Sequence, residues 1–170
     1  QIFYKENFDK AKQSLENNPR NTVKCLFRSG NAENLGKLAN TAFVRKNNGW
    51  FKNGIAPDIA LDESVLSRKE LKIYSKYLSE NGFFGPGSWY MNTELNNEYY
   101  KKAPLKKIEK PTLFIHAKYD RVCDTCHTSL ADPMRENCSN LKEATIESGH
   151  WMAQEKPDDV NKTIKEWLAI

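Results

Sequence analysis

A chain of 170 residues with 39% apolar and 11% aromatic side chains is long enough to bury one sizeable core, which argues against disorder. Lysine and arginine outnumber aspartate and glutamate by 26 to 22, and a net charge of +4 is too small to indicate nucleic acid binding. No run approaches about 18 consecutive apolar residues, so no membrane span is expected. The 4 cysteines are too sparse for a disulfide-stapled scaffold, and the pair Cys123 and Cys126 lacks a second CxxC or a close histidine pair to complete a zinc site.

Helical periodicity dominates the first part of the chain. Phe8, Ala11 and Leu15 recur on one face and predict a helix that ends before Pro19. A second short helix fits residues 22–27. Both segments would pack their apolar faces into a helical core.

The clearest predicted helix starts at Ser67, because Glu70 three residues later completes a capping box, and Gly82 supplies a left-handed stop. Its expected apolar stripe consists of Leu71, Tyr74, Tyr77 and Leu78. Residues 47–60 contain turn-forming clusters and read as an irregular loop pinned by Trp50 and Phe51.

After Pro104 the pattern changes to alternating strands and helices, which is typical of α/β units on a parallel sheet. Residues 112–117 predict a strand buried on both faces, and residues 141–147 predict a weaker second strand. A helix is expected over residues 128–136, and a final helix begins at Pro157. The final helix is expected to bury Val160, Ile164, Trp167 and Leu168.

Two polar residues follow the ends of the predicted strands. Asp120 comes just after the first strand and His150 just after the second, so both are expected at the edge where α/β sheets bind ligands. A carboxylate there can fix the tautomer of an imidazole that deprotonates a hydroxyl or a water. The alternative for Asp120 is ordinary turn chemistry. Of the other histidines, His116 is expected to be a packed strand residue and His127 a surface or capping residue.

Several runs resemble a known family. KPTLFIHAKYDRV (residues 110–122) and IESGHWMAQEKPDDVNKTIKEWL (residues 146–168) resemble the carboxyl-terminal half of an α/β-hydrolase, and most closely the soluble epoxide hydrolases. GPGSWYMN (residues 85–92), RKELKIYSKYLSENGFFGP (residues 68–86) and the opening residues 1–9 resemble their cap domain. The resemblance covers nearly the whole chain, and GHW and WYMN are its most specific parts.

The resemblance implies an α/β fold in which residues 1–103 form a mostly helical cap and residues 104–170 form the carboxyl-terminal part of the hydrolase core. It assigns Asp120 as the charge-relay acid, His150 as the general base and Tyr90 as one of two cap tyrosines that polarise the epoxide oxygen. Tyr4 does not match the second tyrosine, which falls just before the first residue in this alignment.

The activity implied by the resemblance is the opening of a small-molecule epoxide to a vicinal diol through a covalent aspartyl ester. We expect the nucleophile to lie in an amino-terminal portion of the same hydrolase, because the last two core strands cannot close a core alone. The family implies no metal or organic cofactor and a cytoplasmic location, and it is compatible with a homodimer.

Several assignments have alternatives. Trp151 is expected to shape the floor of the site, and Trp50 and Phe51 to line its cap side. Tyr90 would otherwise belong to an aromatic cluster with Trp89, Tyr99 and Tyr100. A haloalkane dehalogenase or an esterase would share the acid and the histidine without needing the cap tyrosine, and a non-catalytic binding protein could use the same fold.

Overall fold

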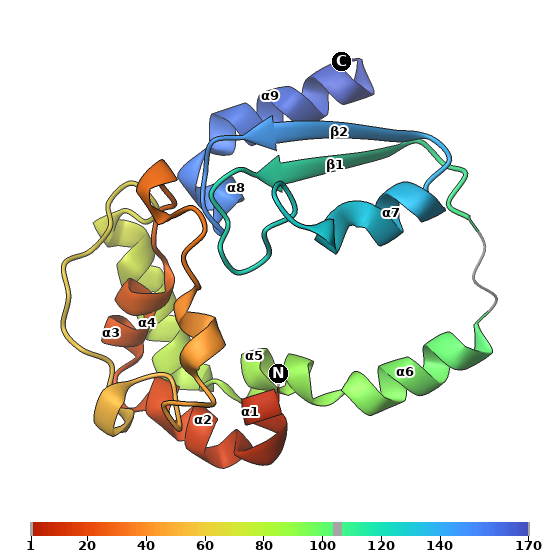
Figure 1. Ribbon diagram of the computed structural model, residues 1–170. Coiled ribbons are helices and arrows are strands. Elements are labelled where there is room, and N and C mark those ends of the chain that lie inside the picture. The colour runs from red at the N-terminus through yellow and green to blue at the C-terminus, as the bar shows by residue number, and fades with distance from the viewer. Residues whose placement is uncertain (1, 104–106, 170) are drawn as a thin grey trace. The chain divides into compact units, whose positions relative to one another are not determined.

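The structure is a computed structural model that describes residues 2–103 and 107–169 (Figure 1). The helices are α1 (Ile2–Glu6), α2 (Phe8–Glu16), α3 (Pro19–Leu26), α4 (Arg68–Asn81), α5 (Phe84–Ser88), α6 (Thr93–Lys102), α7 (Asp132–Asn137), α8 (Met152–Glu155) and α9 (Pro157–Leu168). The strands in the described part are β1 (Thr112–Ala117) and β2 (Leu141–Ile146). Short 3-10 turns include Ala32–Asn34, Asn40–Phe43, Lys52–Gly54, Trp89–Met91 and Ser129–Ala131.

The chain divides into two units, and each unit consists of two separate stretches of the chain. The first unit comprises Gln1–Phe27 and Ala39–Pro104, and the second comprises Arg28–Leu38 and Leu105–Ile170. The predicted boundary after Ala103 adjoins residues 104–106, which lie outside the described residues. A single boundary at that point places residues 28–38 in the first unit, whereas the structure groups them with the second. These residues join the second unit through backbone contacts that no local sequence pattern reveals.

The first unit is built from helices around an apolar cluster. Its buried members are Phe3, Tyr4, Ala11, Leu15, Val44 and Phe83. The cluster confirms that the apolar face of α2 points into a core, as its periodicity predicts. α3 packs along α4, and the aromatic rings of Phe27 and Tyr74 meet with centroids 5.0 Å apart.

α3 begins at Pro19, three residues before the predicted start. The Asn18 side chain accepts a hydrogen bond from the Asn21 N–H at 3.0 Å and caps the helix, and Pro19 occupies the first turn, where its missing N–H costs nothing. The sequence reading was wrong here because it treated the proline only as a helix stop.

α4 has the predicted capping box. The Ser67 Oγ accepts from the Glu70 N–H at 3.2 Å, and the Glu70 carboxylate accepts from the Ser67 N–H at 2.8 Å. Gly82 follows with φ of 70° but ψ of −172°, so it has the positive φ that favours glycine without the left-handed helical ψ. Tyr77 is 57% exposed and was wrongly placed in the buried stripe, because α3 covers only part of α4, whose buried residue is Leu71.

Ser67→Ala should lower the free energy of unfolding by about 1 kcal/mol, the usual effect of removing an N-cap hydroxyl. Both the Glu70 N–H and the Glu70 carboxylate lose a partner in this variant. Chemical denaturation of the chain measures the change. Ser79→Ala is the matched control, because Ser79 lies inside the same helix and its exposed hydroxyl bonds only to the Ser75 carbonyl. An equal loss in both variants would contradict a capping role.

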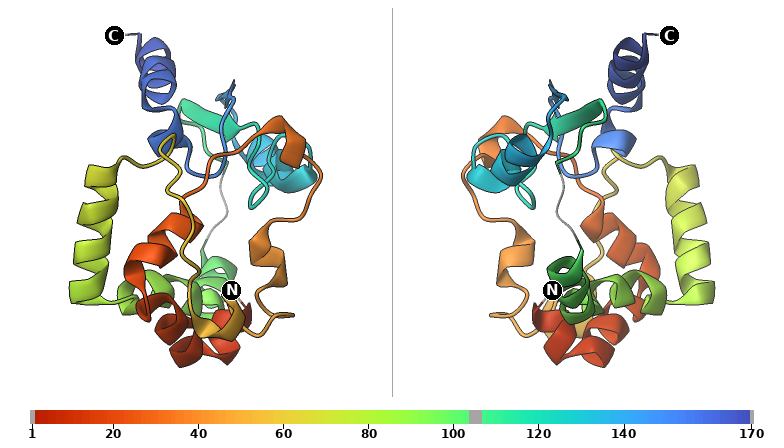
Figure 2. Two further views of the ribbon diagram at one scale, coloured as in Figure 1. Left: turned by 90° about the vertical axis from the view of Figure 1, so that its left-hand side faces the viewer. Right: turned by 90° about the vertical axis from the view of Figure 1, so that its right-hand side faces the viewer.

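The second unit contains a parallel pair of strands. β1 and β2 run in register from Thr112 opposite Leu141 to Ala117 opposite Ile146, which confirms the predicted parallel arrangement. α7 and α9 lie on opposite sides of this pair (Figures 1 and 2). This is the layering of an α/β fold.

Burial in the second unit is lower than predicted. Within β1 only His116 is buried, so the strand is not covered on both faces here, as expected of core strands that cannot close a core alone. α9 begins at Pro157 as predicted, yet it buries none of its described side chains, and Leu168 is 51% exposed. Two described strands offer too little sheet surface to cover the helix.

Candidate active site

The predicted convergence of Asp120 and His150 is confirmed. Beyond the strands, the pairing continues because the Lys118 N–H donates to the Ile146 carbonyl and the Tyr119 N–H donates to the Ser148 carbonyl, both at 2.9 Å. The two loops therefore leave the sheet side by side. Nδ1 of His150 lies 2.9 Å from Oδ2 of Asp120.

The second oxygen of Asp120 is bound by its own loop. Oδ1 accepts from the Val122 N–H at 2.8 Å and from the Cys123 N–H at 3.1 Å. Asp120 therefore forms the turn that the alternative reading expects and also contacts the histidine. The turn bonds hold the carboxylate in the orientation that directs Oδ2 toward His150.

The two ionisable groups stabilise each other's charge. Burial alone would raise the pKa of Asp120, but hydrogen bonds from His150 and from the Cys123 and Val122 N–H groups outweigh it and hold this pKa below its usual range. The hydrogen bond to Asp120 raises the pKa of His150 against the opposing effect of burial. Asp120 is therefore ionised at neutral pH and accepts from Nδ1–H, which leaves Nε2 as the nitrogen that can take up a proton.

Trp151 packs beside His150. Its ring meets the His150 ring edge to face, with centroids 5.4 Å apart and an interplanar angle of 78°. This contact restricts the rotation of the imidazole ring. The structure thus brings together three predicted site residues, Asp120, His150 and Trp151, in the second unit.

The other two histidines, His116 and His127, make hydrogen bonds to neighbouring side chains. The His116 ring is buried, with Nδ1 2.9 Å from the Thr125 hydroxyl and Nε2 2.8 Å from Glu143, so both nitrogens are occupied. His127 is exposed and its Nδ1 lies 2.9 Å from Asp124. The sequence predictions for these two histidines are confirmed.

In the first unit, Tyr90 stacks on Tyr4 with ring centroids 5.2 Å apart and an interplanar angle of 30°. The Tyr4 hydroxyl accepts a hydrogen bond from Trp50 Nε1 at 3.0 Å, and burial raises the pKa of Tyr4. Tyr4 is therefore a packed core residue, whereas the Tyr90 side chain is 42% exposed. The alternative, a core cluster of Tyr90 with Trp89, Tyr99 and Tyr100, is wrong, because these three side chains are 81%, 70% and 60% exposed.

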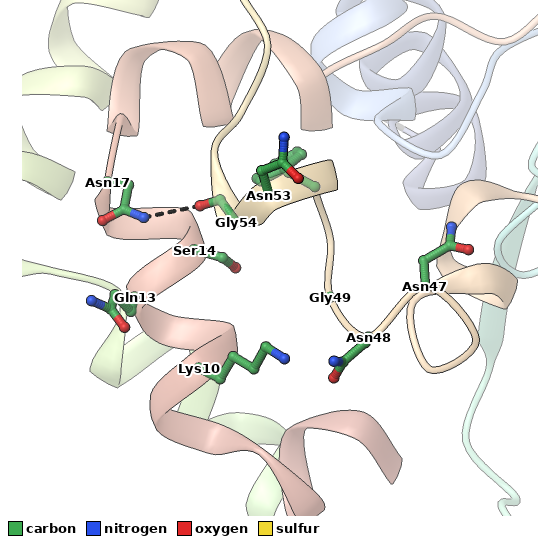
Figure 3. A pocket seen from close by; sticks show the side chains of 10 residues that line it. Lys10, Gln13, Ser14, Asn17, Asn47, Asn48, Gly49, Asn53 and Gly54 are labelled. Atoms are coloured by element: carbon green, nitrogen blue, oxygen red, sulfur yellow. Dashed lines mark hydrogen bonds between the residues drawn. The ribbon is translucent and has the colours of Figure 1, made fainter.

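A polar pocket of about 390 Å³ lies in the first unit (Figure 3). α2 contributes Lys10, Gln13 and Ser14 to its lining, and the facing loop contributes Asn47, Asn48 and Asn53. Of the predicted site residues, Phe51 lines this pocket, while Trp50 instead binds Tyr4. Small-molecule sites are mostly apolar, so this amide-rich lining does not suit an epoxide carrying a hydrocarbon group.

Sequence reasoning missed Glu155. Its carboxylate accepts a hydrogen bond from the Gly149 N–H at 2.8 Å, next to His150. The sequence shows a carboxylate shortly after the GHW run, which could have marked Glu155 as a candidate. Its contact with the Gly149 N–H, however, depends on how the chain turns at Trp151 to start α8.

Two further features can be stated for residues 2–103 and 107–169. No helix there is both long and apolar enough to cross a membrane. No group of three or more histidine, cysteine, aspartate or glutamate side chains is placed to hold a metal ion in that part of the chain.

Parallel strands with an acid and a histidine after their carboxyl ends, in a chain that also contains a helical unit, are typical of an α/β-hydrolase. Solved structures agree with this fold. Epoxide hydrolase A from Mycobacterium thermoresistibile superposes with a TM-score of 0.73 and 22% identity, over 99% of this chain and 51% of that chain. An epoxide hydrolase of Vigna radiata superposes with a TM-score of 0.70 and 19% identity over the same shares.

Sequence comparison finds relatives among the epoxide hydrolases. Bifunctional epoxide hydrolase 2 of Rattus norvegicus is 32% identical over 163 residues, which are 93% of this chain and 27% of the relative. Epoxide hydrolase A of Mycobacterium tuberculosis is 32% identical over 104 residues, covering 61% of this chain and 32% of the relative. No family model matches the chain. The chain is homologous to epoxide hydrolases and has the fold of α/β-hydrolases, and it spans about a quarter to a third of the length of these curated relatives.

Proposed function

We propose that this chain supplies the cap and the carboxyl-terminal core of an epoxide hydrolase that converts an epoxide to a vicinal diol. The observation that carries the proposal is the Asp120 and His150 pair, 2.9 Å apart at the carboxyl edge of two parallel strands, in a chain homologous to epoxide hydrolases. Residues 1–103 act as the cap and residues 104–170 as part of the core, with residues 28–38 returning to the core.

In the first chemical step, an aspartate from an amino-terminal portion of the hydrolase attacks an epoxide carbon. A carbon–oxygen bond of the ring breaks as the ester bond forms, and the ring oxygen becomes an alkoxide. Tyr90 donates a hydrogen bond to this developing alkoxide and so stabilises charge that is absent from the substrate. The stack on Tyr4 limits the orientations available to the Tyr90 ring.

In the second step, Nε2 of His150 removes a proton from water, and the resulting hydroxide attacks the ester carbonyl. The ester bond breaks, and the proton held by His150 passes to the oxygen that leaves the ester. The proton of the new carboxyl group passes to the alkoxide of the first step, so the aspartate and the neutral histidine are regenerated and the diol leaves. Asp120 holds Nδ1–H and stabilises the imidazolium that forms when the proton is transferred. These two reaction steps use only side chains and water and require no metal or organic cofactor.

Tyr90→Phe tests the proposal in the enzyme assembled from this chain and its amino-terminal portion, with styrene oxide as substrate. Losing one donor to the alkoxide should slow ring opening on the order of 10²-fold, while hydrolysis of preformed ester stays unchanged. Single-turnover kinetics separate the two steps. Tyr77→Phe is the control, because this exposed tyrosine lies on α4 and is not assigned to the site.

The competing functions give different outcomes in the same assay. Turnover of a haloalkane or a carboxylic ester without epoxide turnover would assign the site to a dehalogenase or an esterase. Binding of small molecules without turnover of any of these substrates would indicate a non-catalytic member of the fold. Either result would overturn epoxide hydrolysis.

A further inference from the structure

Two glycine backbones touch beside His150. A Cβ atom on Gly30 would lie 2.4 Å from the Gly149 Cα and 2.6 Å from the Gly149 nitrogen. A Cβ atom on Gly149 would in turn lie 2.5 Å from the Gly30 nitrogen. Neither position has space for a side chain, so the backbone at Gly30 packs directly against the backbone at Gly149 in the histidine loop.

Glu155 joins these two backbones. One of its carboxylate oxygens, Oε2, accepts from the Gly149 N–H at 2.8 Å and from the Gly30 N–H at 3.3 Å. Hydrogen bonds to a carboxylate are stronger than bonds to a neutral acceptor. A single oxygen therefore ties the residue before His150 to a segment more than a hundred residues earlier in the chain.

The histidine loop needs such a tie, because little of it is held by the sheet. The Ser148 carbonyl accepts from the Tyr119 N–H at 2.9 Å, and this bond extends the strand pairing up to Ser148. The next residue, Gly149, has no side chain to pack. The His150 side chain beyond it is 41% exposed.

We propose that Glu155 is a positioning residue for the general base: by binding the Gly149 and Gly30 N–H groups it fixes the backbone that directs His150 toward Asp120. The assignment rests on the proposed function for its catalytic consequence. Its structural consequence, a fixed distance of 2.9 Å between His150 and Asp120, does not depend on which substrate is turned over. Misplacing a catalytic group by about 1 Å can reduce a rate on the order of 10²-fold.

Glu155→Ala is the principal test. In the 170-residue chain, NMR titration should show the His150 pKa falling toward about 6.5, its usual value, as the bond to Asp120 is populated less. In the assembled enzyme, kcat should fall about 10- to 100-fold with KM nearly unchanged, because only the orientation of the base changes. Glu155→Gln should restore most of both properties, since its carbonyl oxygen can accept from the same N–H groups.

Matched variants separate positioning from stability. Glu166→Ala removes an exposed carboxylate from α9 and should change neither the His150 pKa nor kcat. Gly30→Ala forces the touching backbones apart without altering any carboxylate, and it should reproduce the Glu155→Ala effects. It also decides the question if Glu155→Ala does not fold.

A lower unfolding free energy with an unchanged His150 pKa and unchanged kcat would show that Glu155 is only structural and would overturn the inference. An unmodified enzyme that turns over no epoxide would instead refute the proposed function. The titration of His150 in the chain would still test the positioning role. The two failures are therefore distinguishable.

Discussion

Replacing His150 with glutamine should stop the reaction after the ester has formed. Glutamine cannot take a proton from water, so the aspartyl ester accumulates while ring opening continues. Steady-state diol formation should fall on the order of 10²- to 10⁴-fold, the usual contribution of general base catalysis. Intact mass measurement of the amino-terminal portion after mixing with styrene oxide should show an added mass equal to that of the epoxide.

His127→Gln is the control for this variant. His127 is exposed in the same unit and contacts an aspartate, Asp124, at 2.9 Å, the same distance as in the proposed catalytic pair. It should retain full turnover and show no adduct. Persistent diol release by His150→Gln would remove His150 from the role of base.

Asp120→Asn should produce the other large effect. The asparagine carbonyl can keep the two bonds from the Val122 and Cys123 N–H groups, so the loop is preserved. Its amide nitrogen then faces Nδ1 of His150 as a donor and favours the tautomer that carries its proton on Nε2. That tautomer cannot act as the base, and in a serine-protease triad the corresponding change lowers kcat on the order of 10⁴-fold.

The pH dependence follows from the two pKa shifts. In the proposed mechanism, the raised pKa keeps the His150 base protonated up to a pH above its usual value near 6.5, so this protonation should set the acid limb of turnover. In Asp120→Asn the main cause of that rise is absent, so the His150 pKa should move down. NMR titration of the chain detects this shift without requiring turnover.

The same pair makes stability depend on pH. A raised His150 pKa gives stabilisation that is complete below the unfolded value of about 6.5 and is lost as pH rises through the folded value. A lowered Asp120 pKa gives stabilisation that is present above the unfolded value of about 3.9 and is lost as pH falls through the folded value. The pair therefore contributes most between about pH 4 and pH 6.5.

Asp124→Asn is the control for both measurements. Asp124 lies in the same loop and bonds to His127 rather than to His150. It should leave turnover and the His150 pKa unchanged. A His150 pKa that stayed raised in Asp120→Asn would contradict the assignment of Asp120 as its partner.

Local patterns predicted several elements well, because their causes lie within a few residues. The capping box at Ser67 depends only on Ser67 and Glu70, and the bounds of β1 follow from one apolar run after Pro111. The approach of Asp120 to His150 was also predictable, since parallel strands place their carboxyl ends at one edge of the sheet.

Burial was less predictable because it depends on the amount of covering surface. β1 and α9 have sequences suited to a larger core, yet the two described strands leave both elements partly exposed. The aromatic partner of Tyr90 was similarly misjudged from sequence. Residues near it in the chain, such as Trp89, point to solvent, whereas the distant Tyr4 stacks on it.

Residue patterns along the chain were enough to predict the helical and α/β character of the two parts and the acid and histidine pair after consecutive strands. Its resemblance to epoxide hydrolases also marked Tyr90 as a candidate. The grouping of residues 28–38 with the second unit and the link that Glu155 makes between Gly30 and Gly149 are visible only in the folded chain. Capping and periodicity depend on residues only a few positions apart, so they can be predicted from the sequence. The close approach of Gly30 and Gly149 joins residues far apart in the chain, so it becomes visible only when these segments are folded together.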